Sequence, residues 1–490
     1  MIKDNIINQG ISKIISAIES VLYYPVFQSA GYDKCIEQNL GNCGSQGIPF
    51  LVLWIMCASL FLTVLLKFVN LRLFTHGFKV ALGKYSSKDD KGEVTPFQSM
   101  VTAIAATVGI GNIAGVVVAV SLGGPGAILW MVIMGFLGMS VTFSEVTLAQ
   151  KYREIDSKGT VLGGPFRYLR YGLADLKMVK TGKFLAMAFA LCCLIGSIGV
   201  AMFQTNQAVS IVTNNIDYLE HYHTIIAFII TFIAALVLIG GIKRIAIAAE
   251  CMVPFMALLY ISGCLTILFF NYQNIPSAIS LIFKEAFDTS AAAGGMIGAI
   301  IAGVKRAMFS NEAGLGTTPI AHSAAKSAYP ARQGAAGCLN PFFDTVIICF
   351  MSGLVIVVTG AYQVQGVEGV QVTAIAFETV APWFSIILTM SIFLFAYSTV
   401  LTYGYYAASA WQYIFNKKTV VIYYIIYFIF LVLSGSMVKF DTIVRITDTL
   451  TLSMCLPNLL GIYLLHRILK KETSYYVTRL QNGEFEKKPI

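Results

Sequence analysis

The stretch AATVGIGNIAG, residues 105–115, lies inside an apolar segment that is long enough to cross a membrane. It combines glycines with polar side chains, namely Thr107, Gly109, Gly111, Asn112 and Gly115. Glycine weakens a helix, and an amide side chain is a poor neighbour for lipid. The combination indicates either a helix that packs closely on another helix or a helix that unwinds at a binding site.

The composition around this stretch is that of a polytopic membrane protein. Of 490 residues, 57% are hydrophobic and 12% are charged, and the mean hydropathy is +0.74. An ordinary soluble domain has about 25% charged residues. The net charge of +9 does not indicate a nucleic-acid partner, because the basic residues are spread over many loops. The expected surroundings are a lipid bilayer.

A membrane-spanning helix needs roughly 20 mostly apolar residues. We predict eleven such segments, at residues 49–67, 99–119, 127–149, 184–211, 224–241, 246–270, 291–315, 337–360, 383–411, 420–438 and 442–466. If the N terminus is external, the cytoplasmic side holds all lysines and arginines except Lys3, Lys13, Lys34, Lys284, Lys439 and Arg445. This bias predicts an external N terminus and a cytoplasmic C terminus. The cytoplasmic segments then include residues 305–335, with Lys305 and Arg306.

The order of segments predicts the domain organisation. Residues 1–48 form an external segment that begins with an amphipathic interfacial helix rather than a signal peptide. The further boundaries are an extra transmembrane helix at 49–67, a cytoplasmic linker at 68–98, a first five-helix repeat at 99–270, a second, inverted repeat at 291–466 and a cytoplasmic tail at 467–490. Cys35 and Cys43 lie close together in the external segment, so a disulfide between them is a hypothesis.

A second interruption, AAAGGMIGAIIAGVKRAMFSNEAGLGTTP at residues 291–319, falls five predicted spans after the first. An odd offset gives the two interrupted helices opposite orientations, which is typical of inverted repeats with a binding site at the membrane midplane. Unwound backbone groups cannot be satisfied by lipid, but they can face an ion or a polar ligand. Two matched interruptions therefore favour a binding site over close packing alone.

Five stretches resemble the alanine/glycine:cation symporter family, also called the sodium:alanine symporter family. They are TVGIGNIAGVVVAVSLGGPGAILW (107–130), FSEVTLAQKYR (143–153), GGIKRI (240–245), GVKRAMFSNEAGLGTTPIAHSAAKSAYPARQG (303–334) and FAYSTVL (395–401). The resemblance implies an all-α protein with the LeuT-type 5+5 inverted repeat plus one extra N-terminal span. It also implies uptake of a small neutral amino acid, alanine or glycine, across a bacterial inner membrane. Sodium or a proton would be the coupling ion, with no other cofactor.

The same resemblance implies roles for individual residues. The substrate would contact Thr107, Gly109, Ile110, Gly111, Phe203, Gln204, Ala302 and Gly303, with the amides of residues 109–111 on its carboxylate. One cation would lie near Thr107 and Asn112. A second would bind the carbonyls of Ala105 and Val108 and the hydroxyls of Ser398 and Thr399.

Several alternatives remain open at this stage. Ile110 replaces a threonine that is common in the family, so a larger neutral amino acid such as serine or glutamine is an alternative substrate. Glu145 and Asp344 are intramembrane carboxylates that hold a gate or take up a proton. An ion channel is the alternative from another class. An enzyme is not expected, since neither a GxGD nor an HExxH motif is present. Oligomeric state is left open.

Overall fold

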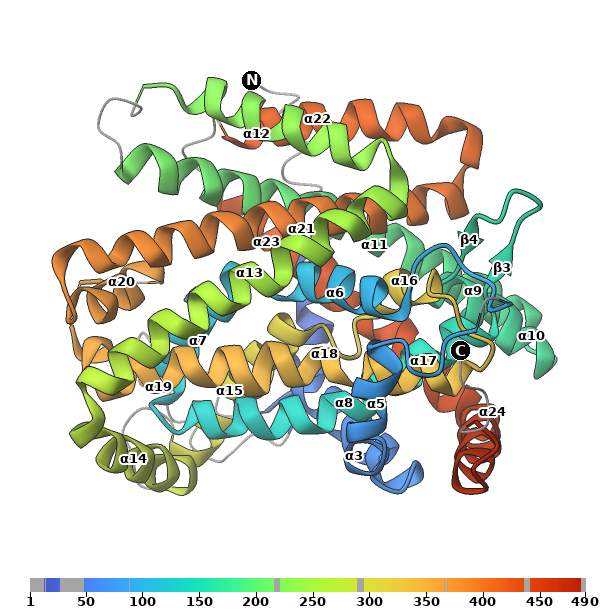
Figure 1. Cartoon of the computed structure of the whole chain (residues 1–490), viewed down its shortest axis with the longest axis horizontal. Helices are drawn as coiled ribbons and strands as arrows, with labels where there is room; N and C mark the ends of the chain where they lie inside the picture. The colour runs from blue at the N-terminus through green and yellow to red at the C-terminus, as the bar shows by residue number, and fades with distance from the viewer. Residues whose placement is uncertain are drawn as a thin grey trace.

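The computed structural model describes residues 13, 15–26, 48–87, 89–215, 221–288, 295–364, 366–367, 369–435 and 441–485. Almost all of them are helical, and the long helices run roughly side by side across the molecule (Figure 1). Cys35 and Cys43 lie outside the described residues.

The described residues up to 288 include thirteen helices that position the rest of the chain and both two-stranded ribbons. The helices are α3 (Phe50–Leu65), α4 (Val69–Arg72), α5 (Phe74–Ala81), α6 (Pro96–Thr107), η1 (Ile110–Asn112), α7 (Ala114–Gly123), α8 (Ala127–Lys151), α9 (Pro165–Arg167), α10 (Leu173–Asp175), α11 (Val179–Asn215), α12 (His223–Leu238), α13 (Gly241–Phe270) and α14 (Ile275–Phe287). The ribbons are antiparallel and pair β1 (Pro25–Val26) with β2 (Ile48–Pro49), and β3 (Glu154–Ile155) with β4 (Val161–Leu162).

The described residues from 295 onward form helices joined by turns and short loops. The elements are α15 (Gly295–Asn311), α16 (Thr318–Ser323), α17 (Pro330–Gly337), α18 (Leu339–Pro341), the π-helix η5 (Phe342–Cys349), α19 (Phe350–Val358), α20 (Val370–Glu378), α21 (Ser385–Ile414), α22 (Val420–Gly435), α23 (Asp441–Ser453) and α24 (Cys455–Gln481).

The predicted spans coincide with helices, but not all of them meet the length of a full membrane crossing. Within the described residues, seven helical runs are long and apolar enough, or eight if α6 and α7 form one span bent by 66°. The helices α3 and α12 are apolar but shorter, and α15 carries Lys305 and Arg306 in its middle. The total of eleven spans stays a prediction.

Apolar side chains on the outer helices face away from the protein. Phe228 and Phe232 on α12 are 59% and 56% exposed, and Leu258 on α13 is 70% exposed. Such a surface is stable only against lipid. The interior is filled instead by small and aromatic residues, where α8 packs on α15 and α11 packs on α21.

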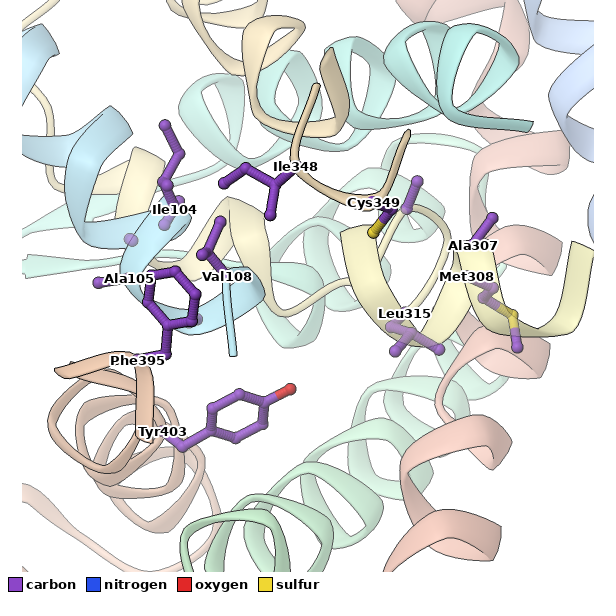
Figure 2. Packing of buried hydrophobic residues seen from close by; sticks show 14 of the residues in the cluster. Ile104, Ala105, Val108, Ala307, Met308, Leu315, Ile348, Cys349, Phe395 and Tyr403 are labelled. Carbon is purple, nitrogen blue, oxygen red and sulfur yellow. The ribbon is translucent and has the colours of Figure 1, made fainter. Parts of the chain in front are cut away.

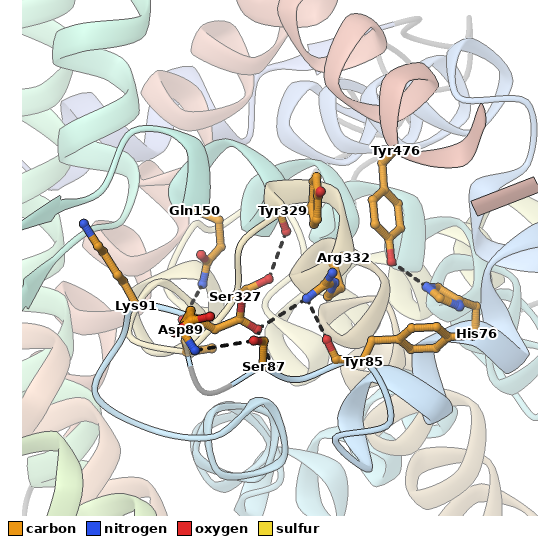
Figure 3. Close-up of polar contacts among 12 residues, drawn as sticks. His76, Tyr85, Ser87, Asp89, Lys91, Gln150, Ser327, Tyr329, Arg332 and Tyr476 are labelled. Carbon is orange, nitrogen blue, oxygen red and sulfur yellow. Dashed lines mark hydrogen bonds and ion pairs between the residues drawn. The ribbon is translucent and has the colours of Figure 1, made fainter. Parts of the chain in front are cut away.

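The segments before α6 and at the end of α24 are held together by polar contacts (Figure 3). The ring of His76 in α5 bonds the hydroxyl of Tyr476 in α24 at 2.8 Å. Burial, with the nearby charges of Arg332 and Lys79, lowers the pKa of His76 to about 4, so the ring is neutral at physiological pH. Residues 467–481, predicted as part of a tail, thus continue α24 and pack on the protein.

Lys305 and Arg306 lie inside α15, not in a loop. The Lys305 ammonium sits over the ring of Tyr23, 4.5 Å from its centroid, beside the helical residues 15–22. The structure places residues 305–311 in this helix, and the cytoplasmic location of residues 305–335 stays a prediction. Two charged residues in an apolar run are typical of the end of a membrane span. Here both belong to a continuous helix, and Lys305 contacts Tyr23 of the N-terminal segment.

Candidate functional site

Two interrupted helices border one cavity of about 310 Å³. The first break is residues 108–113, between α6 and α7, and the second break is residues 312–317, between α15 and α16. The lining combines these breaks with α6, α7, α11, α15, α21 and α23. Its residues are Ala106, Thr107, Gly109, Ile110, Gly111, Ala114, Gly115, Val118, Val200, Phe203, Gln204, Arg306, Phe309, Glu312, Leu315, Thr399, Tyr403, Thr447, Asp448 and Thr451.

The first break arises because a side chain takes over a helical hydrogen bond. The amide of Gly109 donates to Asn112 Oδ1 at 2.9 Å instead of to the carbonyl of Ala105. The Ala105 carbonyl is thereby released from the helix. The amides of Ile110 and Gly111 contact no acceptor among the described residues. Three amides were predicted to contact a carboxylate. Those of Ile110 and Gly111 are available for it, whereas that of Gly109 is bonded to Asn112.

Glycine is required where the first break approaches α11 and α21. A Cβ on Gly109 would lie 2.9 Å from Gln204 Nε2 and 3.2 Å from Thr399 Oγ1. A Cβ on Gly111 would meet nothing within 4 Å, since this residue borders open cavity. Gln204 is buried, and its Oε1 has no hydrogen-bond partner in the described structure. A buried acceptor without a partner beside a cavity is a candidate ligand group.

One cluster of oxygens lies where α21 crosses the end of α6. The hydroxyls of Ser398 and Thr399 are each 3.2 Å from the Ala105 carbonyl oxygen. They also lie 3.0 and 2.9 Å from the Phe395 carbonyl of their own helix. Figure 2 shows Phe395 facing Ala105 and Val108. Because each hydroxyl has one proton, its oxygen keeps lone pairs for a cation.

A second cluster surrounds Asp344 of η5, on the other side of the first break. The carboxylate accepts hydrogen bonds from Asn112 Nδ2 (2.6 Å), Ser310 Oγ (2.6 Å) and Thr345 Oγ1 (2.8 Å), and also interacts with the Thr107 side chain. Asp344 is fully buried, and no lysine, arginine or histidine of the described chain pairs with it. Asn112 reaches this cluster but does not line the cavity.

The second break is held by polar side chains of the break itself and of neighbouring helices. Asn311 Oδ1 accepts from the amide of Ala313 at 3.0 Å, and Glu145 Oε1 accepts from the amide of Gly314 at 3.0 Å. Glu312 has φ +57°, a left-handed conformation that is uncommon outside glycine. Its carboxylate accepts from the hydroxyls of Thr317 and Tyr403.

Ala302 and Gly303 do not line the cavity. They lie in the continuous helix α15, where a Cβ on Gly303 would be 2.5 Å from the Ala127 carbonyl oxygen. Ala302 Cβ packs against Gly123 of α7 in the same way. At these positions the small residues serve close helix packing, and within the interruption predicted at residues 291–319 the break lies at 312–317.

Among the cavity residues that were not predicted as ligands, four have ionisable side chains: Arg306, Glu312, Tyr403 and Asp448. Glu312 opens the glycine-containing run EAGLGT, which directly follows α15. That run was part of the predicted interruption at 291–319, and the second break coincides with it. Arg306 and Asp448 lie far apart in the sequence and belong to no common motif. Only the structure shows that both line the cavity.

Comparison with known proteins assigns the family. The family model "Sodium:alanine symporter family" matches residues 34–489. The chain belongs to the sodium:alanine symporter family. It is 38% identical over 435 residues to the sodium/alanine symporter AgcS of Methanococcus maripaludis, covering 87% of this chain and 94% of that protein. A Bacillus subtilis protein named "Probable sodium/glutamine symporter GlnT" is 30% identical over 436 residues, covering 89% of each chain.

The fold of this family member resembles that of a solved structure. The crystal structure of MhsT in complex with L-phenylalanine matches with a TM-score of 0.50 at 14% identity, covering 79% of this chain and 98% of that one. At that identity the likeness concerns the fold alone. The family assignment confirms the predicted class: a multi-pass membrane symporter that couples a small amino acid to a cation, and not an enzyme.

Proposed function

We propose that this symporter couples inward movement of sodium to uptake of alanine, with the amino acid bound in the 310 Å³ cavity at the first break. The observation that carries the proposal is the pair of unengaged amides, Ile110 and Gly111, which border this cavity next to the unpartnered Gln204 Oε1. Amide donors suit the carboxylate of an amino acid, and an amide oxygen suits its ammonium group.

Two cation positions flank the amino acid. One uses the Ala105 carbonyl with the hydroxyls of Ser398 and Thr399, and we include the Val108 carbonyl at the end of α6. The other uses Asp344 with the hydroxyls of Thr107 and Ser310. A buried carboxylate without a basic partner is costly until a cation neutralises it, which supports this second position.

The geometry also supports a mechanism of coupling. The first break joins all three sites, because Asn112 contacts Asp344 while holding the amide of Gly109. A cation that orders this break therefore also orders the amides of Ile110 and Gly111 for the amino acid. Each ligand raises the affinity for the other, which is the thermodynamic requirement for symport.

The proposal includes an architecture and an orientation. The helices α6 to α13 and α15 to α24 form two five-span inverted repeats, preceded by α3 as an extra span. The two breaks meet at one cavity, as a repeat of this kind requires. The N terminus is external, the C terminus is cytoplasmic, and the protein resides in a bacterial inner membrane.

Uptake into proteoliposomes tests the proposal. Labelled alanine, glycine, serine and glutamine are supplied with a sodium gradient or a proton gradient imposed separately. We expect alanine to accumulate with the sodium gradient alone. Accumulation with a proton gradient in sodium-free buffer would reject sodium coupling. Currents without accumulation would instead indicate a channel.

A larger neutral amino acid is the second candidate substrate. The open space beside Gly111 leaves room for a longer side chain, and the name of the relative GlnT refers to glutamine. Serine or glutamine uptake that exceeds alanine uptake in the same assay would favour this candidate.

A further inference from the structure

A basic groove lies outside the substrate cavity, between the end of α3 and the long helix α24. Its volume is about 390 Å³, and its lining includes three cationic side chains, Lys67, Arg72 and Lys470. Figure 1 shows α3 and α24 next to each other at the edge of the molecule, where α24 projects beyond the neighbouring helices. We call these three residues and the space between them the basic groove.

The positive charge of the basic groove is uncompensated within the described part of the chain. None of the lining residues is acidic, and none of the three cationic side chains forms an ion pair there. The acidic residues nearest along α24 and its end are engaged elsewhere: Glu472 pairs with Lys151, and Glu484 pairs with Arg479. The hydroxyls of Ser474 and Thr478 line the same groove and add donors. This set of groups suits a phosphate-type anion.

An apolar strip borders the groove on the side of α3. Leu60, Val64, Phe68 and Leu71 are 56%, 57%, 51% and 62% exposed. In a protein that spans a membrane, such side chains contact acyl chains. A ligand that fills the groove and covers the strip therefore has an anionic head and an apolar body.

The backbone between the strip and the groove is unusual. Lys67 and Phe68 both have φ +55°, and two consecutive left-handed residues with bulky side chains are rare. The turn is closed by bonds from the amide of Phe68 to the Thr63 carbonyl at 2.8 Å and from that of Lys67 to the Val64 carbonyl at 3.0 Å. As a result of this turn, the adjacent residues Lys67 and Phe68 serve different surfaces. Lys67 lines the groove, whereas Phe68 belongs to the strip. Strained backbone of this kind is concentrated at functional sites.

We propose that the basic groove binds the phosphate of an anionic phospholipid, whose acyl chains lie along the strip of Leu60, Val64, Phe68 and Leu71. Basic pockets between membrane helices are the expected place for such headgroups. This inference does not depend on which amino acid the symporter carries.

The test uses full-length protein purified in detergent and stripped of lipid. Thermal unfolding is measured while phosphatidylglycerol, phosphatidylcholine or inorganic phosphate is added. We expect phosphatidylglycerol to raise Tm and phosphatidylcholine to leave it unchanged. The variant K67Q/R72Q/K470Q should need roughly a hundredfold more phosphatidylglycerol, at about fivefold for each cation near an anionic headgroup. The control K177Q/K180Q/K183Q removes the same charge from exposed residues outside the groove and should behave as wild type.

Two results would overturn the proposal. One is an unchanged phosphatidylglycerol response in the triple variant, or an equal loss in the control, which would indicate general surface charge. The other is an equal rise of Tm with inorganic phosphate alone, which would assign the groove to a free anion. If the triple variant does not fold, the single variants R72Q and K470Q replace it, each with an expected loss of roughly fivefold.

Discussion

The first and second breaks border the same cavity but treat their backbone groups in opposite ways. In the first break, a single side chain, Asn112, engages one amide and leaves those of Ile110 and Gly111 without acceptors in the described structure. In the second break, side chains from the break and from neighbouring helices engage its groups, as Glu145 does with the amide of Gly314. The first break therefore offers hydrogen-bond donors to a ligand, whereas the backbone groups of the second break are bonded to protein side chains.

This difference shows how two related interruptions can serve different purposes. Backbone groups inside a membrane must be satisfied, either by protein or by a ligand. At the second break, Asn458 donates to Glu145 Oε1 at 2.6 Å and to the Gly314 carbonyl at 2.8 Å, so protein satisfies both. We therefore expect substitutions at the first break to change transport and those at the second break to change folding stability.

The largest effect is expected for Gly109→Leu. The new side chain would begin 2.9 Å from Gln204 Nε2 and would occupy the space between α11 and α21. We expect sodium-driven uptake in proteoliposomes to fall to background while the protein remains folded. The control is Cys57→Leu on the exposed face of α3, which should transport normally. Normal uptake by the Gly109 variant would show that the first break is not the substrate site.

The second break should respond to Glu145→Ala through stability. Removing the carboxylate leaves the buried amide of Gly314 and one donor of Asn458 without an acceptor, at a cost of about 1–3 kcal/mol. Thermal unfolding in detergent should show a lower Tm, whereas Glu145→Gln, which retains an acceptor oxygen, should lose less. An unchanged Tm together with a raised KM would make the second break a ligand site like the first.

The sequence predicted the first break well because its polar residues stand out in an apolar run. Of the residues predicted there as substrate ligands, Thr107, Gly109, Ile110 and Gly111 all line the cavity, and their role in binding stays a prediction. The second break lies within the predicted interruption 291–319, but Ala302 and Gly303, which were predicted as ligands, lie in the continuous helix α15, because glycine serves close packing and unwinding equally well. Gly303 packs on the Ala127 carbonyl, a partner that is far away in sequence and therefore invisible in it.

Other features of the site depend on contacts between distant segments. The sequence identified Asp344 as an intramembrane carboxylate whose burial is energetically costly. It could not decide between a gate and proton uptake, because the hydrogen-bond partners of Asp344 were unknown. Those partners come from α6, η1, α15 and η5, through Thr107, Asn112, Ser310 and Thr345. Likewise, the left-handed backbone of Glu312 is a tertiary effect, since nothing in a glutamate side chain favours it.

Ser398→Ala should produce a smaller and more specific effect at the first break. It removes one hydroxyl near the Ala105 carbonyl, and a hydrogen-bonding group on a charged ligand contributes about 1.5–3 kcal/mol. The sodium concentration for half-maximal uptake should therefore rise roughly tenfold or more, with little change in Tm. Ser391→Ala on the same helix is the matched control, because that hydroxyl bonds only the Ile387 carbonyl in the described structure. Equal sodium dependence in both variants would exclude Ser398 as a ligand.

The smallest effect is expected for Gly111→Ala. This variant probes the side of the first break that faces the open cavity. The added methyl group meets no atom within 4 Å, so folding and glycine or alanine uptake should be nearly unchanged. The methyl group does occupy cavity space, and one methylene-sized change in a pocket alters discrimination by about 1–3 kcal/mol at most. Uptake of glutamine should therefore fall relative to glycine when both are measured in the same proteoliposomes. An unchanged ratio would place the substrate side chain away from Gly111, toward the end of the cavity that Arg306 and Asp448 line.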